Sequence, residues 1–165
     1  MPFAILGVGP GRDYHVEVDE YVPLTVQWEG YSRLQDAPRS VVLEIGESLV
    51  EVKTDRNSGE VVEVVLLDLV RPECVEDVLD ITETKIDPGV PCVSFDESDL
   101  EGSNCEVRLY ADGLQIRFAD GRAARRFGDT KAMFGFSDPG RLVEFKVRLK
   151  PDLMARLRSM CHLVR

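Results

Sequence analysis

The sequence predicts a small α+β protein that consists mainly of antiparallel β-sheet and has two short helices. Three observations predict this class. Apolar and polar residues alternate along many short segments, turn residues such as Gly, Asn and Asp separate these segments, and two segments carry a helix-start signal. The chain has 165 residues, of which 44% are hydrophobic, which is enough for one substantial core. We therefore expect a single domain over residues 1–165.

The first elements are expected to be strands joined by turns. The run ILGVGPGRD contains three glycines, and residues 14–28 then alternate in the manner of strands. A phosphate-binding loop requires a helix directly after its glycines, because the helix N-terminus receives the anion. The glycine run is therefore interpreted as a turn between two strands. After a connection over residues 29–40, strands are expected near 41–45, 49–54 and 61–69, with a polar turn at 55–59.

Two segments in different halves of the chain resemble each other. GEVVEVVL (59–66) aligns with GRLVEFKV (140–147), and VRPECVEDVLDI (70–81) aligns with LKPDLMARLRSM (149–160). Both of the latter segments place a proline and a carboxylate where a helix would begin. The shared order of hairpin, sharp turn and helix predicts a duplicated ββα unit, with pseudo-repeats over 41–81 and 105–160. The alternative is that common turn chemistry alone makes the hairpins alike.

The segment between the aligned helices is expected to contain further strands near 91–95, 105–110, 114–118 and 122–127. Asp-Gly pairs at 112–113 and 120–121 separate the last three of these strands. Asp-Gly between alternating segments is a strong hairpin signal, so strand content should dominate this part of the chain.

The chain carries a net charge of −10, and this charge is unevenly distributed. Residues 1–103 contain 7 basic and 23 acidic residues, a net of −16, whereas residues 104–165 contain 13 basic and 7 acidic residues, a net of +6. Such asymmetry indicates a charged partner surface. The sequence pI near 4.7 argues against nucleic-acid binding, which needs basic surface to replace the counterions of phosphates.

Other classes of protein are also disfavoured. The sequence contains no stretch of about 20 apolar residues and no signal-peptide pattern, so we expect no membrane association and a cytoplasmic location. The four cysteines form no C-x-x-C pair and are interpreted as reduced thiols, so neither a metal site nor a cofactor is expected. His15 and His162 lie outside any recognisable catalytic context, and no catalytic residue is assigned.

Clustered carboxylates and two aromatic residues are the candidate partner-binding groups. Carboxylates close together can attract and hold a basic surface, although a solvated loop is the simpler interpretation. Trp and Tyr combine a large apolar area with a polar tip, although Trp28 lies on an alternating strand and is equally suited to the core. The partner-binding candidates are Asp96, Glu97, Asp99, Glu101, Trp28 and Tyr31.

Three arginines in DGRAARRFGD form a weaker candidate site for an anion. If this segment is a strand, Arg122 and Arg126 point to one face and Arg125 to the other. The arginines suit carboxylate or phosphate groups, but neither a glycine nest nor a helix start accompanies them. The alternative is that they pair with the acidic first part of the chain.

These observations predict an acidic protein that binds a basic protein partner. A specific form of this hypothesis is an immunity or inhibitor protein that blocks a nuclease-like partner. Two alternatives remain open. One is a small-molecule-binding or enzymatic domain with its site between the two hairpin-helix units, and the other is a structural subunit that forms a homodimer.

Overall fold

The structure of this chain is a computed structural model, which describes residues 3–81, 85–96 and 105–161. We call residues 3–81 the first half and residues 85–161 the second half. The first half contains β1 (Phe3–Gly9), β2 (Tyr14–Glu17), β3 (Leu24–Trp28), the 3-10 helix η1 (Glu29–Arg33), β4 (Arg39–Ile45), β5 (Ser48–Thr54), β6 (Val61–Asp68) and β7 (Glu73–Cys74). The second half contains β8 (Val90–Phe95), β9 (Glu106–Leu109), β10 (Gly113–Arg117), β11 (Arg125–Gly128), β12 (Ala132–Phe136), β13 (Leu142–Arg148) and the helix α1 (Pro151–Cys161).

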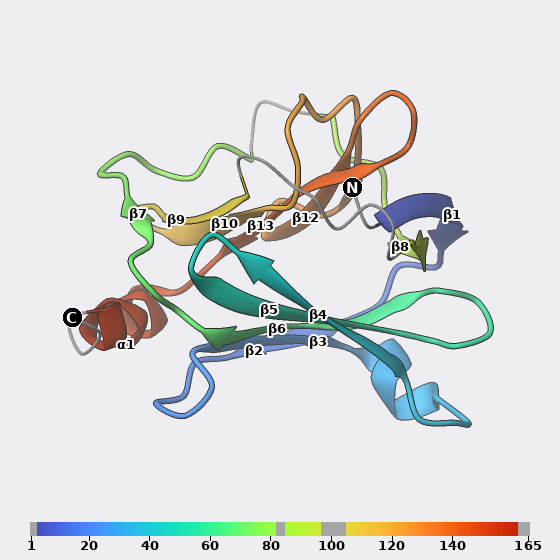
Figure 1. Cartoon of the computed structure of the whole chain (residues 1–165), viewed down its shortest axis with the longest axis horizontal. Helices are drawn as coiled ribbons and strands as arrows, with labels where there is room; N and C mark the ends of the chain where they lie inside the picture. Colours follow the sequence, from blue (N-terminus) through green and yellow to red (C-terminus); the bar gives the residue numbers. More distant parts are fainter. Residues whose placement is uncertain (1–2, 82–84, 97–104, 162–165) are drawn as a thin grey trace.

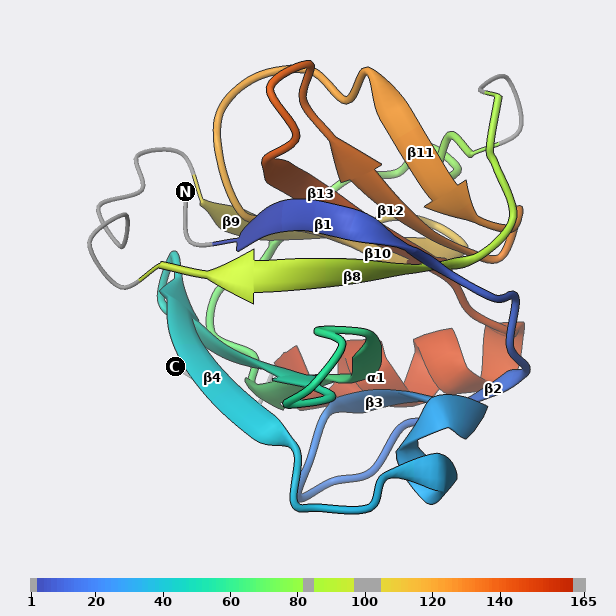
Figure 2. The same cartoon turned by 90° about the vertical axis from the view of Figure 1, so that its right-hand side faces the viewer.

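Two sheets pack face to face as the lower and upper layers of Figure 1. The first sheet has the strand order β2–β3–β6–β5–β4, and the second sheet has the order β11–β12–β13–β10–β9–β7. Neighbouring strands are antiparallel except for β7 and β9. The antiparallel pair β1–β8 lies at one side of the sheets and α1 at the opposite side (Figures 1 and 2). The predicted strand-rich class with mainly antiparallel sheet is therefore confirmed.

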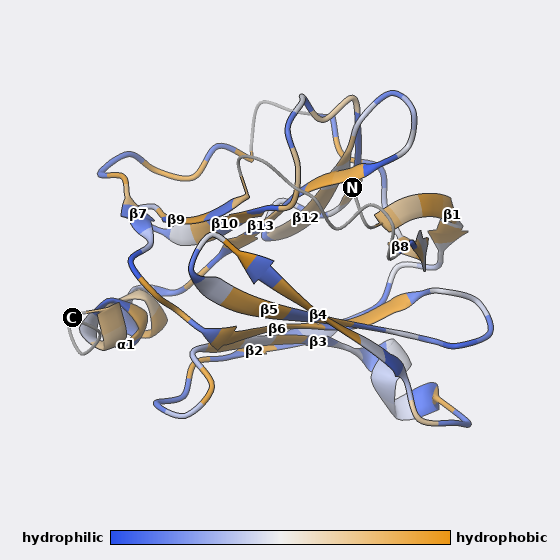
Figure 3. Cartoon of the chain, in the orientation of Figure 1, coloured by the Kyte–Doolittle hydropathy of each residue, from blue (hydrophilic) through white to orange (hydrophobic). Residues whose placement is uncertain are grey.

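The core lies between the facing sides of the two sheets. In β3 and β5 every second residue is buried, as expected for strands with one face on a core. The ring of Trp28 in the first sheet lies 5.4 Å from that of Phe134 and 5.9 Å from that of Phe145 in the second. Met154 and Leu157 of α1 belong to the same core. Hydrophilic residues occupy the turns that project from both sheets (Figure 3).

The two sheets share one strand order. The strands of the first sheet are neighbours in the order β2–β3–β6–β5–β4, and those of the second in the order β9–β10–β13–β12–β11. In both sheets this is the first, second, fifth, fourth and third strand of the set along the chain. The hairpins that look alike in sequence occupy the same place in each arrangement, as β5–β6 and β12–β13. Gly59 and Gly140 end the two turns with positive φ values of 77° and 86°, which explains why both turns need glycine.

Each half of the chain places its first strand on the hairpin of the other half. The amide of Ile5 in β1 donates to the carbonyl of Gly140 at 2.7 Å, and the amide of Val93 in β8 donates to the carbonyl of Gly59 at 2.8 Å. Ile5 and Val93 are themselves partners in the β1–β8 ladder. The two halves are therefore joined by reciprocal contacts.

The helix predicted within residues 70–81 is wrong. β7 pairs in parallel with β9, and the amides of Val75 and Leu79 donate to the carbonyl of Leu109 and to Asp112 Oδ1, both at 2.7 Å. These partners satisfy backbone groups that a helix would have paired internally. The other predicted helix is present, because α1 begins at Pro151 with Asp152 in its first turn. The described residues thus contain one α-helix. The first of the two predicted ββα repeats therefore lacks its helix.

Only the end of the glycine run, residues 10–13, connects β1 and β2 as predicted, because Gly7 and Gly9 lie within β1 itself. A partly buried ion pair lies beside this connection, in which Arg12 Nε lies 2.8 Å from Glu60 Oε2. A side chain at Gly9 or Gly30 would collide with the Glu60 carboxylate, because a Cβ atom there would lie 2.7 or 2.5 Å from its oxygens.

Among the described helices, none is both long and apolar enough to cross a membrane.

Candidate functional site

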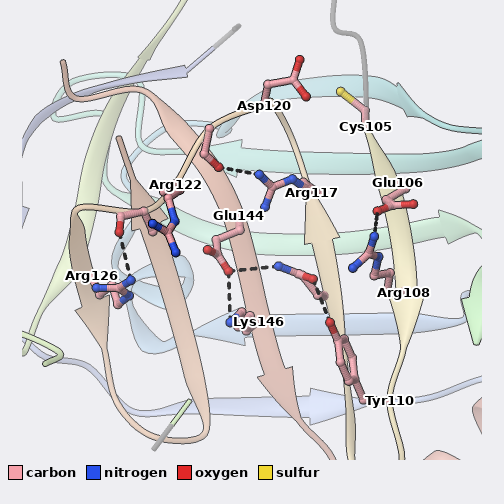
Figure 4. A pocket seen from close by; sticks show the side chains of 13 residues that line it. Cys105, Glu106, Arg108, Tyr110, Arg117, Asp120, Arg122, Arg126, Glu144 and Lys146 are labelled. Carbon is pink, nitrogen blue, oxygen red and sulfur yellow. Dashed lines mark hydrogen bonds and ion pairs between the residues drawn. The ribbon is translucent and has the colours of Figure 1, made fainter. Parts of the chain in front are cut away.

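The outer face of the second sheet, which points away from the core, carries a polar hollow of about 920 Å³ (Figure 4). We call it the basic pocket, because five cationic side chains and three carboxylates line it. Its lining residues are Cys105, Glu106, Arg108, Tyr110, Gln115, Arg117, Asp120, Gly121, Arg122, Ala123, Arg126, Glu144 and Lys146.

Strand register determines which side chains reach this face. Leu114 and Ile116 of β10 are fully buried in the core, so Gln115 and Arg117 between them point outward. The antiparallel partners of Arg117 are Glu106 and Glu144, and they share its face. This alternation brings charged residues from β9, β10 and β13 side by side.

Gly135 allows the loop 118–124 to pack closely against the sheet beside the pocket. It pairs with Glu144 on one side and Arg126 on the other. A Cβ atom at Gly135 would lie 2.8 Å from Ala123 Cβ and 2.8 Å from Glu144 Cγ, so the loop 118–124 approaches the sheet as closely as a glycine allows. Arginines hold this loop, since Arg117 donates to the carbonyl of Gly121 and Arg126 donates to that of Ala123 at 2.9 Å.

The cations of the pocket differ in how far carboxylates neutralise them. Arg108 pairs with Glu106 at 2.7 Å, and Lys146 pairs with Glu144 at 3.3 Å. Among the ion pairs between described residues, none includes Arg117, Arg122 or Arg126. A guanidinium has five N–H donors, so each of these arginines keeps donors for another acceptor.

Glu144 forms the floor of the pocket. It is only 7% exposed, and its Oε2 accepts hydrogen bonds from Gln115 Nε2 at 3.1 Å and pairs with Lys146 Nζ at 3.3 Å. Gln115 is held in turn by the Tyr110 hydroxyl, at 3.2 Å from its Oε1. The side chains of Glu144 and Arg122 point toward the same space in Figure 4.

The segment that replaces the predicted helix covers the other end of this outer face. Leu79 and Ile81 are buried against Met133 of β12. The Lys146 ammonium donates to the carbonyl of Asp80 at 2.9 Å, which fixes this segment beside the pocket. The open area is therefore limited to the part of the sheet that carries the arginines.

Among the described residues, the equivalent face of the first sheet carries a different set of charges. Glu63 of β6 occupies the place of Glu144, but Gln27 donates to one of its oxygens at 2.6 Å and Lys53 pairs with the other at 3.0 Å. Tyr31 of η1 lies over Lys53, with its ring centre 5.7 Å from Nζ. Burial alone would lower the pKa of Lys53, but Glu63 and Glu51 raise it above its usual value. The strand pairing aligns one row of residues across each outer face. The row Gln27, Glu63, Lys53 and Ser40 in the first sheet corresponds, in that order, to the row Arg117, Glu144, Gly135 and Arg126 in the second.

The structure separates the three arginines that the sequence singled out. Arg122 and Arg126 line the basic pocket, whereas Arg125 lies outside it, with its guanidinium 5.2 Å from the centre of the Phe127 ring. Sequence reasoning missed Arg117, Glu144 and Gly135. The alternation in LQIRF (114–118) could have indicated Arg117, but no local pattern shows that Gly135 faces Glu144.

The candidate partner-binding residues lie in different places. Trp28 is 5% exposed and belongs to the core, which was the alternative interpretation of this residue. Tyr31 is half-buried on the outer face of the first sheet, and Asp96 is exposed after β8. The remaining acidic candidates, Glu97, Asp99 and Glu101, fall outside the described residues.

Among the described residues, few ion pairs join the acidic first part of the chain to the basic tail. Of the ion pairs between described residues, only that of Glu73 with Arg108, at 3.1 Å, joins the two charge segments. The others, such as Arg12–Glu60, are formed within one segment. None of the described residues before Cys105 lines the basic pocket.

The four cysteines hold neither a disulfide nor a metal centre in the part of the chain that is described. Cys74, Cys92, Cys105 and Cys161 are free thiols. Burial raises the pKa of the Cys92, Cys105 and Cys161 thiols, which favours the protonated form. Within residues 3–81, 85–96 and 105–161, no group of three or more His, Cys, Asp or Glu residues is arranged to hold a metal ion.

Neither a scan against models of known protein families nor a search among curated proteins found a match to this chain. The functional argument therefore depends on the chain's own residues.

Proposed function

We propose that this protein is a binding domain for a small anionic ligand, held in the basic pocket of the second sheet. The observation that carries the proposal is the set of three arginines, Arg117, Arg122 and Arg126, around a hollow with no carboxylate in ion-pair contact with them among the described residues. Guanidinium groups bind carboxylate and phosphate groups through paired hydrogen bonds. The ligand class is therefore a compound with one or more carboxylate or phosphate groups.

The size of the ligand is limited by the charge of the whole protein. A net charge of −10 repels a long polyanion, whose binding depends on extended basic surface. A hollow of about 920 Å³ falls within the range of sites for small molecules. A small organic anion fits both constraints better than a nucleic acid.

The internal comparison between the sheets supports this assignment. We propose that the two halves are copies of one unit of six strands, β1–β6 and β8–β13, because they share a strand order and reciprocal β1 and β8 contacts. If so, the fold does not require the pocket, since Lys53 and Tyr31 fill the equivalent place in the first unit. Arg117, Gly135 and Arg126 are then features of the second unit alone.

The test is a titration with citrate and with pyrophosphate, followed by changes in amide chemical shifts. Both probes carry several anionic groups, and binding should perturb β10, β13 and the loop 118–124. Replacing both Arg122 and Arg126 with alanine should weaken binding about tenfold or more, since each charge-assisted contact contributes substantially. Arg125→Ala is the matched control, because Arg125 neighbours the pocket in sequence but does not line it. Equal loss in the control, or no binding by either probe, would refute the proposal.

The uneven charge supports a second candidate function, an acidic protein that binds a basic partner. We propose for this case an immunity or inhibitor protein whose carboxylates occupy the basic cleft of a nuclease-like toxin. The supporting observation is that the first sheet is not neutralised by the basic tail among the described residues. Acidic surfaces of this kind accelerate association with basic targets.

This second candidate is tested by association kinetics with basic toxins encoded near the gene, at low and high salt. Changing Asp96, Glu97, Asp99 and Glu101 to the corresponding amides should slow association at low salt and have less effect at high salt. Unchanged association rates would remove this acidic segment from the interface.

A further inference from the structure

We propose that Cys74 and Cys161 form a redox pair, in which a peroxide converts the two thiols into a disulfide that joins β7 to α1. Cys74 belongs to the first half of the chain and Cys161 to the second. Neither residue lines the basic pocket, so the pair is independent of the proposed function. The proposal depends on a cavity that the two cysteines share.

This cavity has a volume of about 320 Å³ and is lined by residues from β7, β9 and α1. Cys74 lines it from β7 and Cys161 from α1, and Leu109 of β9 is buried beside them. β7 and α1 lie on the same side of the molecule in Figure 1. The remaining cysteines lie elsewhere, since Cys92 belongs to β8 and Cys105 lines the basic pocket. The fold therefore places two of the four thiols at one cavity.

Cys74 also lies close enough to Cys161 to affect its ionisation. Burial raises the pKa of the Cys161 thiol, and the neighbouring Cys74 raises it further. Arg158 of α1 acts in the opposite direction, and Glu76 is the other charged residue of the cavity. Cys74 is exposed, whereas Cys161 is half-buried. A peroxide in solution therefore reaches Cys74 first, and Cys161 is the thiol that resolves the product.

Both thiols are free to turn toward each other. Cys74 Sγ lies 3.8 Å from the carbonyl oxygen of Pro72, and Cys161 Sγ lies 3.5 Å from that of Leu157. These contacts are weak, because a thiol is a poor donor. Cys161 is the last residue of α1, and β7 pairs with β9 at only two positions, so both backbones are able to adjust. Such adjustment brings the Cα atoms to the separation of about 4.4–6.8 Å that a disulfide needs.

The reaction has two steps. The thiolate of Cys74 attacks one oxygen of hydrogen peroxide and the O–O bond breaks, so Cys74 becomes a sulfenic acid and the departing hydroxide takes up the thiol proton as water. The thiolate of Cys161 then attacks Sγ of Cys74, the S–O bond breaks, and the second hydroxide takes up the proton of Cys161. The two thiols together lose two electrons and two protons, and one peroxide becomes two waters.

The experiment treats the folded chain with one equivalent of hydrogen peroxide until the peroxide is consumed. Digestion without reductant, followed by mass spectrometry, should show a peptide pair that joins residues 74 and 161, and dithiothreitol should separate it. The number of free thiols, counted in denaturant, should fall from four to two.

Three variants distinguish the pair from unspecific oxidation, and circular dichroism verifies that each folds. Cys92→Ser is the matched control, because Cys92 is also half-buried, and it should form the same cross-link as the unchanged protein. Cys161→Ser should stop at the sulfenic acid of Cys74, which dimedone traps, and Cys74→Ser should form no cross-link. Four free thiols after treatment, or a disulfide of Cys74 with Cys92 or Cys105, would overturn the inference.

Discussion

Replacing Gly59 and Gly140 with alanine, one at a time, tests the reciprocal contacts between the halves of the chain. Both glycines have positive φ values, 77° and 86°, where an alanine is strained by about 1–2 kcal/mol. Their surroundings differ. A Cβ atom at Gly59 would lie 2.5 Å from the backbone oxygen of Val93, whereas one at Gly140 would lie 2.9 Å from Cγ2 of the Ile5 side chain.

The difference in surroundings sets the expected magnitudes. The Ile5 methyl group can move by a few tenths of an ångström, so Gly140→Ala should lower the free energy of unfolding mainly through backbone strain, about 1–2 kcal/mol. The backbone of β8 is held by its ladder with β1, so Gly59→Ala adds an overpacking cost of about 1–3 kcal/mol. The total for Gly59→Ala is therefore about 2–5 kcal/mol.

Urea denaturation measures both changes. The midpoint should fall most for Gly59→Ala and less for Gly140→Ala, with an unchanged slope if unfolding stays two-state. Gly11→Ala is the control, because a Cβ atom at Gly11 meets nothing within 4 Å, and it should leave the midpoint nearly unchanged. If Gly59→Ala were no more destabilising than Gly140→Ala, the close contact between β8 and the first hairpin would not exist as described.

Three further predictions concern stability and assembly. Burial and the hydrogen bond to Asp129, at 2.9 Å, raise the pKa of Tyr14 above the ordinary tyrosine value of 10.0. The contribution of Tyr14 to the free energy of unfolding is therefore complete below pH 10.0. It is lost as the pH rises through the pKa of Tyr14 in the folded protein. Tyr14→Phe should therefore flatten the alkaline fall in the free energy of unfolding, and an unchanged fall would contradict the contact between Tyr14 and Asp129. Trp28→Ala should cost about 3–5 kcal/mol in urea denaturation, the range for a large core aromatic, and a small change would contradict its core position. Fragments 1–83 and 84–165, expressed together, should copurify through the β1–β8 ladder, and independent elution of the two would count against the reciprocal contacts.

Turns and strands could be predicted from the sequence because their signals are local. The similar turns before Val61 and Leu142 contain an aspartate and a glycine, and the structure uses that glycine for its positive φ in both. The helix α1 was predicted correctly for the same reason, since proline and aspartate act within its own first turn. Local chemistry therefore accounts for most of the element assignments.

The missing helix shows where local signals stop being sufficient. The segment after Pro72 carries the same start signal as α1, but the edge of β9 lies beside it and takes up its backbone groups. The sequence contains no sign of that edge, because β9 comes more than thirty residues later. The same limitation applies to the basic pocket, whose key pairs join β10, β12 and β13.

The pocket offers a way to separate charge from shape. Gly135→Lys would introduce the residue found at the equivalent place in the first sheet, opposite Glu144 as Lys53 is opposite Glu63. If the pocket attracts anions through its net positive charge alone, an added cation should strengthen the binding of citrate or pyrophosphate. If binding needs the loop 118–124 in its place against Gly135, the added side chain should weaken it.

We expect binding to weaken, for a reason visible in the contacts. Any side chain at Gly135 must displace Ala123, because a Cβ atom there lies 2.8 Å from Ala123 Cβ, and the loop that carries Arg122 must move with it. The new ammonium would also compete with Lys146 for the carboxylate of Glu144. Chemical-shift titration of Gly135→Lys therefore decides the matter directly. Tighter binding than in the unchanged protein would show that the arginines act as a diffuse positive surface, and that the packing of the loop 118–124 on Gly135 does not shape a specific site.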